Sequence, residues 1–201
     1  LEEELKAKMR EELRKLQRRL GVTTIYVTHD QIEAMTMADR IAIMDKAVLQ
    51  QYADPETVFK RPKNIFVGGF IGEPPMNFID CELVHEDSKV FIRNQNIRIP
   101  LPPERLAQMK KNVGKEVVLG VRDTHMKVEH SPFDEYSVKG EVYVAEPRNE
   151  DQIVTVKVGE DFLVVSSTIN FKTDIGDKVW VSMNLDMASL FDRQTTVSVY
   201  E

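Results

Sequence analysis

The chain has 201 residues, 42% of them hydrophobic and 30% charged, and this composition is that of a globular protein with a sizeable core. Its net charge of −6 argues against a protein that binds the phosphate backbone of nucleic acids. The single Cys81 excludes an internal disulfide, and no apolar run approaches the ~20 residues that span a bilayer. We therefore expect a soluble, cytoplasmic chain that could serve a membrane only as a peripheral subunit.

Residues 1–20 are predicted to form an amphipathic helix. Apolar side chains recur at steps of three and four residues and give one stripe: Leu1, Leu5, Met9, Leu13 or Leu16, and Leu20. Acidic residues precede basic ones along the other faces, as the helix dipole and i,i+4 pairing favour. We interpret the basic run as a solvated helix face rather than a nucleic-acid site. Gly21 is expected to cap the helix.

A buried strand over residues 23–28 is predicted to lead into a helix over residues 30–39. Thr, Ile, Tyr and Val side chains fill the first run, as in the core strand of an α/β sheet. Two overlapping capping boxes mark the helix start: Thr28 with Gln31, and Asp30 with Glu33. His29 follows the strand, where open α/β sheets place ligand crevices, and its ring could donate an N–H to a phosphate. Taken alone, a histidine there is more often structural.

A hairpin and two short helices are predicted next. The hairpin strands cover residues 40–44 and 47–52, on either side of a turn. Asp54 and the proline after it begin the first helix, and a short apolar helix covers residues 64–72. The Gly-Glu-Pro-Pro run that follows marks a domain boundary, so we predict two domains, residues 1–72 and 76–201.

Beyond this boundary, short strands alternate with polar turns, as in a small antiparallel barrel. The predicted strands cover residues 78–84, 90–93, 96–99, 115–121 (running on towards 128), 138–145, 152–158, 162–166, 178–184 and 196–200. Hairpin turns are expected at Asp87-Ser88 and Asn94-Gln95, and a short helix at residues 102–109. The predicted fold class is α+β or mixed, with an incomplete α/β remnant before a small all-β, OB-fold-like barrel.

The sequence Ile-Tyr-Val-Thr-His-Asp-Gln-Ile-Glu-Ala-Met, which begins at Ile25, resembles the switch-histidine segment of ABC transporter ATPases. It is most similar to the carbohydrate-importer branch, the maltose-transporter type of ATP-binding subunit. In that family the histidine contacts the terminal phosphate of ATP, so the resemblance implies a catalytic, ATP-contacting role for His29 in a complete ATPase. Asp30 and Gln31 would secure the helix start behind it.

Several parts of the family's ATP site are absent from these 201 residues. The phosphate-binding loop, Q-loop, signature sequence and catalytic glutamate precede the D-loop leucine, with which Leu1 aligns; Glu2 replaces the aspartate that follows. Gly114-Lys115 lacks the upstream glycine and the Ser or Thr of a phosphate-binding loop. Ala47 and Ala53 stand where the family has glycine, and alanine in a left-handed turn costs about 1–2 kcal/mol. The chain alone is therefore predicted not to hydrolyse ATP.

The second half resembles the OB-fold regulatory domain of the same ATPases, a domain of the TOBE type. The matching stretches are residues 118–122, 140–147, 175–179 and 190–192. Asp123-Thr124, Arg148-Asn149 and Ser189 depart from the family pattern. We expect these departures to change the surface that meets a partner rather than the fold.

Four other groups were weighed as sites. They are the carboxylates Glu146, Glu150 and Asp151, the histidines His125 and His130 with Glu129, the thiol of Cys81, and the aromatic residues Phe133, Tyr143, Phe162 and Trp180. We interpret the carboxylates as solvated loop acids and the cysteine as a small buried residue. No metal site is expected, because one strand places residues i and i+5 on opposite faces. Alternation suggests that several of the aromatic residues point inward, which disfavours nucleic-acid stacking.

We therefore predict a C-terminal fragment of the ATP-hydrolysing subunit of an ABC importer for sugars or related solutes, cytoplasmic and peripheral at the inner face of the membrane. ATP and Mg belong to the complete family protein, and none is expected to be bound to this chain. The partners implied are a second copy in a homodimer, permease subunits and a regulatory protein, but no nucleic acid. Apolar faces at residues 1–20 and 23–28 need cover, so we predict a homodimer or a rearranged N-terminal segment. The alternative is a stand-alone, non-enzymatic dimerisation or regulator-binding module from a split or truncated gene.

Overall fold

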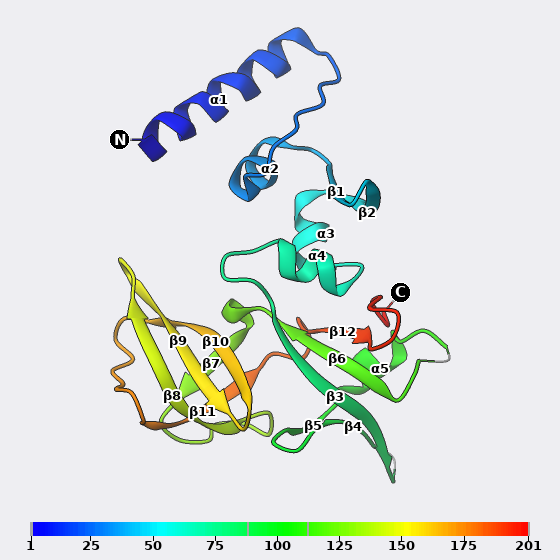
Figure 1. The fold of residues 1–201 in the computed structure, drawn as a ribbon, viewed down its shortest axis with the longest axis vertical. Coiled ribbons are helices and arrows are strands. Elements are labelled where there is room, and N and C mark those ends of the chain that lie inside the picture. Colours follow the sequence, from blue (N-terminus) through cyan, green and yellow to red (C-terminus); the bar gives the residue numbers. More distant parts are fainter. Residues whose placement is uncertain (1, 88, 112, 201) are drawn as a thin grey trace. The chain divides into compact units, whose positions relative to one another are not determined.

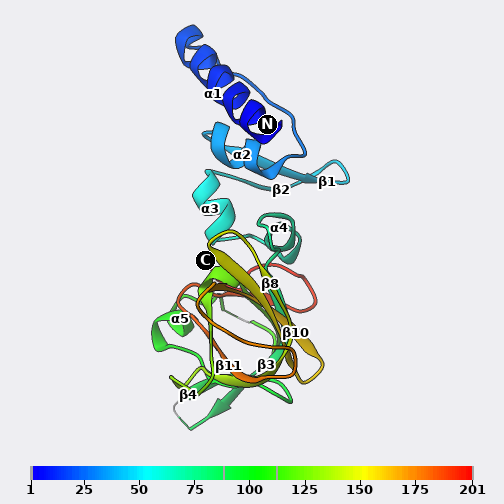
Figure 2. The same cartoon turned by 90° about the vertical axis from the view of Figure 1, so that its left-hand side faces the viewer.

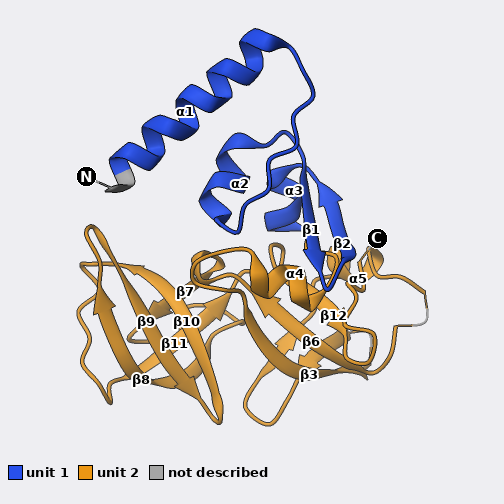
Figure 3. Ribbon diagram, turned by 45° about the horizontal axis from the view of Figure 1, so that its top comes forward, with its two compact units in different colours: residues 1–61 blue, residues 62–201 orange. Residues whose placement is uncertain are grey.

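The computed structural model describes residues 2–87, 89–111 and 113–200. Over these ranges the chain forms five α-helices, one 3-10 turn and twelve β-strands (Figure 1). It divides into two compact units, Leu1–Arg61 and Pro62–Glu201 (Figure 3). In the described ranges no helix is both long and apolar enough to cross a membrane.

Unit 1 consists mainly of helices and one hairpin. Its elements are α1 (Glu2–Leu20), α2 (Gln31–Met37), β1 (Ile41–Asp45), β2 (Val48–Ala53) and α3 (Pro55–Lys60). The first predicted helix is confirmed, although Leu1 lies outside the described residues. Gly21 ends it with a φ of 63°, and its N–H donates to the carbonyl of Gln17 at 3.0 Å. This is the left-handed glycine cap that the sequence predicts.

The predicted strand over residues 23–28 is wrong. These residues belong to an irregular segment between α1 and α2, and the side chains of Ile25 and Val27 are each 89% exposed. A strand needs a neighbour to receive its backbone hydrogen bonds, and no described strand of the chain pairs with this segment. The β-branched composition alone therefore does not produce a strand.

The hairpin and α3 follow the prediction closely. Strands β1 and β2 pair antiparallel, and the turn between them places Lys46 and Ala47 at φ values of 45° and 65°. Asp54 begins α3, because its carboxylate accepts from the N–H of Thr57 at 2.9 Å and Pro55 takes the first helical position. Ala53 has no positive φ, so only Ala47 occupies a conformation that favours glycine.

Unit 2 is built from two antiparallel five-stranded sheets, with orders β12-β6-β3-β4-β5 and β10-β9-β8-β11-β7 (Figures 1 and 2). Its elements are α4 (Ile65–Phe70), β3 (Asn77–Glu86), β4 (Lys89–Arg93), β5 (Arg98–Pro100), α5 (Pro103–Ala107), β6 (Glu116–Val121), η1 (Asp123–His125), β7 (Met126–Glu129), β8 (Val138–Pro147), β9 (Asp151–Val158), β10 (Asp161–Thr168), β11 (Lys178–Met183) and β12 (Ser189–Asp192). Ser88 of the predicted Asp87-Ser88 turn lies outside the described residues. The mixed fold class is confirmed.

Two predicted strands of unit 2 need correction. The strand starting near residue 115 does not run on to 128, because the 3-10 turn η1 separates β6 from β7. Residues 196–200 form isolated bridges instead of the predicted last strand. The last strand is β12, which pairs with β6 and was not predicted. Its Leu190 and Phe191 are fully buried, so core packing selects this segment over the residues that follow.

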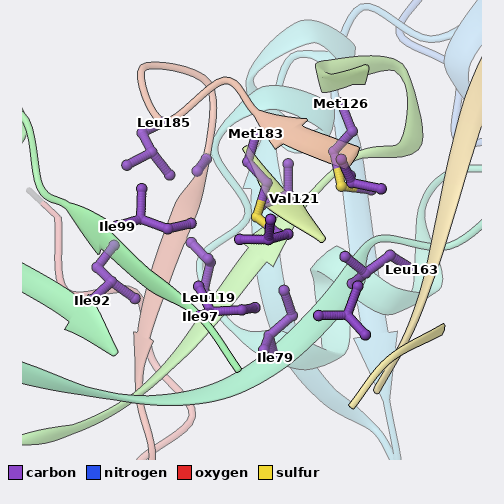
Figure 4. Packing of buried hydrophobic residues seen from close by; sticks show 14 of the residues in the cluster. Ile79, Ile92, Ile97, Ile99, Leu119, Val121, Met126, Leu163, Met183 and Leu185 are labelled. Carbon is purple, nitrogen blue, oxygen red and sulfur yellow. The ribbon is translucent and has the colours of Figure 1, made fainter. Parts of the chain in front are cut away.

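One large apolar core joins the two sheets. Ile79, Leu119 and Leu163 are among its buried side chains, and Figure 4 shows how they meet between the strands. The edge strands β7 and β10 contact each other, so their sheet nearly closes into a barrel. The amide of Asn77 connects the sheets by donating to the carbonyls of Val121 at 3.1 Å and Val164 at 2.9 Å.

Candidate functional site

The turn before α2 holds the predicted site residue His29 at the protein surface. The Asp30 carboxylate caps the helix by accepting from the N–H groups of Ile32 at 2.8 Å and Glu33 at 3.1 Å. The Thr28 hydroxyl in turn accepts from the N–H of Asp30 at 2.9 Å. His29 lies between these two polar residues and is exposed. The predicted cap at Asp30 is therefore confirmed.

The carboxylate of Glu33 differs from the predicted capping box. In such a box it would reach back to the N–H of Asp30, but that N–H donates to Thr28. The Glu33 carboxylate instead accepts from the hydroxyls of Thr28 at 2.7 Å and Tyr26 at 3.1 Å. The turn is consequently tied to the segment that precedes it as well as to the helix that follows.

Hydrogen bonds set the charge state of this turn. The backbone N–H of Glu33 makes the largest contribution to lowering the pKa of Asp30, and the charges of Arg10 and Lys6 on α1 add to it. The hydrogen bond to the Glu33 carboxylate raises the pKa of Tyr26. The turn thus favours the ionised carboxylate of Asp30 and leaves the imidazole of His29 open to solvent, where a ring N–H can meet an anionic ligand.

The other candidate residues do not assemble a site. No group of three or more metal-ligating side chains comes together in the described ranges. His130 instead hydrogen-bonds the carbonyl of Lys172 at 2.9 Å and stacks on Phe171. Glu146, Glu150 and Asp151 are exposed, but only Glu150 lies in the loop, because Glu146 belongs to β8 and Asp151 begins β9. Cys81 is buried, and burial raises the pKa of its thiol to about 12. The interpretation of the cysteine as a small buried residue is confirmed, whereas the loop position predicted for the three carboxylates is wrong for Glu146 and Asp151.

The aromatic residues lie differently from the prediction. Tyr143 is 58% exposed and Phe162 is 48% exposed, and their rings pack edge to face at 5.0 Å. Alternation along the strands gives the inward positions to Val142 and Leu163 instead. Phe133 is also exposed, so the expectation that several of these rings point inward is wrong for three of the four. The expected absence of nucleic-acid binding stays a prediction.

An unforeseen polar centre lies in the core of unit 2. The guanidinium of Arg122 is buried and donates to the carbonyl of Gly68 at 3.0 Å and to the carbonyl of Ile71 at the end of α4. Gly72 passes directly beside it with a φ of 111°, and a Cβ there would meet Nη1 at 2.7 Å. The sequence offered one signal, a glycine before the Pro-Pro run, but nothing that paired it with an arginine fifty residues later.

An open depression on unit 2 carries charges that neutralise each other. It is lined by Asp80, Cys81, Glu82, Arg93, Asn94, Gln95, Glu116, Val117 and Arg193. Arg93 and Lys115 form ion pairs with Glu82, and Arg193 forms one with Asp80. These pairs offer a ligand little uncompensated charge, so the exposed turn around His29 remains the better candidate.

Comparison with known proteins agrees with the OB-fold architecture of unit 2. Residues 72–126 match the MalK OB fold domain family. The chain is 40% identical to the trehalose/maltose import ATP-binding protein MalK of Thermococcus litoralis, covering 100% of this chain and 55% of that protein. It is 36% identical to the oligosaccharides import ATP-binding protein MsmX of Bacillus subtilis, over 99% of this chain and 55% of that protein. The chain is 38% identical to the xylose/arabinose import ATP-binding protein XacK of Haloferax volcanii, over 97% of this chain and 50% of that protein.

The class of protein is thus a mixed α and β chain with an OB-fold domain. More particularly, the chain is similar throughout to the C-terminal half of sugar-import ABC transporter ATP-binding proteins, which confirms the predicted resemblance. It spans about half the length of these relatives. A solved structure of the molybdate-binding protein ModG covers 57% of this chain and 94% of its own with a TM-score of 0.45 and 15% identity, a likeness too distant to bear on the site.

Proposed function

We propose that this chain provides the C-terminal part of the ATP-hydrolysing subunit of an ABC importer for sugars or related solutes. The observation that carries the proposal is identity of 36–40% to sugar-import ATP-binding proteins along virtually the whole chain. In this proposal the complete ATPase binds ATP with Mg and drives permease subunits at the inner face of the membrane. Residues 1–72 belong to its nucleotide-binding domain, and residues 76–201 form its regulatory domain.

His29 is proposed to contact the terminal phosphate of ATP in that complete ATPase. The exposed imidazole and the tight turn around it support this role, because Thr28 and Asp30 fix the backbone on both sides of the ring. A fixed donor costs little reorganisation when charge develops on a phosphate. The other phosphate-binding groups of the family are absent from the sequence of this chain, so on its own it is proposed to be inactive.

The complete subunit is further proposed to work as a homodimer whose regulatory domain receives a protein signal. The exposed apolar residues of unit 1, which include Ile25 and Val27, support association because they require cover in water. The match of residues 72–126 to the MalK OB fold domain family supports the regulatory assignment.

A chimaera tests the role of His29. Residues 1–201 replace the matching C-terminal half of the Thermococcus litoralis relative, and ATP hydrolysis is measured with Mg present. We expect hydrolysis by the chimaera and a loss of at least about 100-fold in His29→Ala, the usual effect of removing a charge-stabilising donor. His85→Ala is the matched control, because His85 is also exposed but lies on β3 of unit 2. If His29→Ala hydrolyses ATP as fast as the control, the assignment is overturned.

A further inference from the structure

The outward face of the second sheet of unit 2 combines lysine and aromatic side chains. Strands β10, β9, β8 and β11 lie side by side in this sheet (Figure 1). Lys157 of β9 lies opposite Phe162 of β10, and directly opposed residues point to the same face. Lys139 of β8 lies opposite Trp180 of β11 in the same way. Tyr143 of β8 completes the set, because its ring packs against Phe162 with the centroids 5.0 Å apart.

Lys139 and Lys157 have no ion-pair partner among the described residues. Glu141 lies between them in the register, opposite Lys157 and two residues from Lys139, but it forms its ion pair with Lys178 of β11. The next strand, β7, adds one lysine and one glutamate, so it leaves the balance of charge unchanged. A chain with a net charge of −6 therefore presents two uncompensated positive charges on this face.

The rings on this face are already covered by their neighbours. The ammonium group of Lys157 lies 5.9 Å from the centroid of Phe162, and that of Lys139 lies 5.6 Å from the centroid of Trp180. The rings of Tyr143 and Phe162 are inclined by 73°, so one ring turns its edge to the other. These contacts occupy ring faces that a stacked base would need, whereas ring edges and apolar area stay accessible.

We infer that this face binds an acidic segment of a regulatory protein, in which an apolar side chain is followed by two carboxylates at two-residue steps. The inference rests on the regulatory role proposed above and specifies its contact. Tyr143 and Lys139 are four residues apart on β8, and Lys157 lies opposite the residue midway between them. An extended segment advances about 6.8 Å per two residues, as β8 itself does. Its apolar side chain then meets the Tyr143 ring, and its carboxylates meet the two lysines in turn.

Two other classes of partner fit this face less well. A nucleic acid carries a charge at every phosphate, so two ammonium groups would neutralise only a small part of its backbone. An anionic membrane would attract Lys139 and Lys157, but the net charge of −6 on the whole chain opposes its approach. A short acidic segment needs only the two lysines and the apolar area beside them.

Fluorescence anisotropy of a labelled peptide that reads Phe-Ser-Glu-Ser-Glu tests the charge pairing on the 201-residue chain. We expect a dissociation constant of roughly 10–100 µM, because the contact is small. Lys157→Glu should weaken binding at least about tenfold, since it turns an attraction into a repulsion. Lys89→Glu is the matched control: Lys89 is also an exposed strand lysine, but it lies on β4 in the other sheet. Equal binding by the two variants, or equal binding of the peptide Phe-Ser-Lys-Ser-Lys to the parent, overturns the inference.

A second pair of variants tests the apolar contact. Phe162→Ser should weaken binding of the acidic peptide about fivefold, whereas Phe70→Ser, at an exposed ring on α4, should leave it unaltered. Far-UV circular dichroism checks that each variant keeps its fold. Oligothymidylate or phosphatidylglycerol vesicles that bind the chain while the acidic peptide does not would overturn the peptide assignment.

The chimaera described above tests the face in a full-length subunit. We expect the acidic peptide to bind the chimaera as tightly as it binds the 201-residue chain. Binding to the chain alone would mean that the N-terminal half covers the face, and it would overturn the inference. ATP hydrolysis by the chimaera does not require the peptide, so a failure of peptide binding leaves the role of His29 standing. Loss of hydrolysis with intact peptide binding contradicts only the proposed ATPase role.

Discussion

At the scale of single residues, Arg122 is the largest side chain that is completely buried in the described core. Burial lowers the pKa of its guanidinium to about 10, and the neighbouring Asp123 carboxylate opposes this shift. Hydrogen bonds to carbonyls at the end of α4 offset the cost of burying this charge. These carbonyls need donors, and they lie at the negative end of the helix dipole. Arg122 therefore attaches α4 to the barrel through the polar ends of the helix, rather than through apolar packing alone.

Replacing Arg122 should destabilise unit 2 strongly. Arg122→Ala leaves the carbonyls of Gly68 and Ile71 without this donor and opens a cavity, so we expect a loss of about 3 kcal/mol in the free energy of unfolding. Urea unfolding followed by the fluorescence of Trp180, the only tryptophan, measures it. Arg148→Ala, at an exposed arginine, should change the same quantity by less than about 0.5 kcal/mol. Equal losses in the two variants would contradict the anchoring role.

Asp30 should make the start of α2 sensitive to acid. Its folded pKa lies below the ordinary 3.8, chiefly through the N–H of Glu33, so its stabilising effect is complete above the unfolded pKa and is lost as the pH falls through the folded value. A carboxyl titration by NMR should give a midpoint below 3.8. Asp30→Asn should keep the cap, because an amide oxygen also accepts, and remove this titration from α2. A midpoint at or above 3.8 would show that the cap is not formed in solution.

At the scale of elements, the β1–β2 turn carries backbone strain at one alanine. Ala47 has a φ of 65°, so Ala47→Gly should stabilise the hairpin by about 1 kcal/mol. Ala53→Gly is the contrasting change: Ala53 lies in β2 opposite Ile41 with no positive φ, and glycine there should destabilise by about 0.5–1 kcal/mol. Hydrogen exchange of the Gln51 amide reports both changes as opening free energies. Effects of the same sign would show that the left-handed turn is absent in solution.

Elements with local signals could be predicted from the sequence, and elements that need distant partners could not. Asp54 followed by Pro55 specifies the start of α3 within four residues, and the same holds for the turn at His29. Residues 23–28 have strand composition without a partner, and β12 is selected by its pairing with β6, about seventy residues earlier. The Arg122 centre also depends on contacts across fifty residues. Residue spacing along the chain does not predict such long-range contacts.

At the scale of the whole molecule, burial is distributed unequally between the two units. Over the described part of unit 1, the buried residues are Ile41, Ile43, Gln51 and Val58. Unit 2 contains the large core that runs through both of its sheets. Apolar burial is the main favourable term in folding, so unit 1 gains much less stabilising free energy from its own buried side chains than unit 2 does.

Amide hydrogen exchange should show this inequality directly. We expect amides of β9 and β10 to exchange at least roughly a thousandfold more slowly than those of α1, since opening free energies follow local burial. Equal protection of both units in a dilute monomer would contradict the picture of a weakly stabilised unit 1.

The exposed segment before α2 has a consequence for the fate of the chain in concentrated solution. Residues 23–28 read Thr-Thr-Ile-Tyr-Val-Thr, without proline, glycine or charge, and two of their apolar side chains are 89% exposed. Six residues of this kind are the composition of amyloid-forming segments, and stacking of identical copies has no natural end. Chaperone binding or a covering strand would therefore decide whether this chain accumulates as a usable protein or as aggregate.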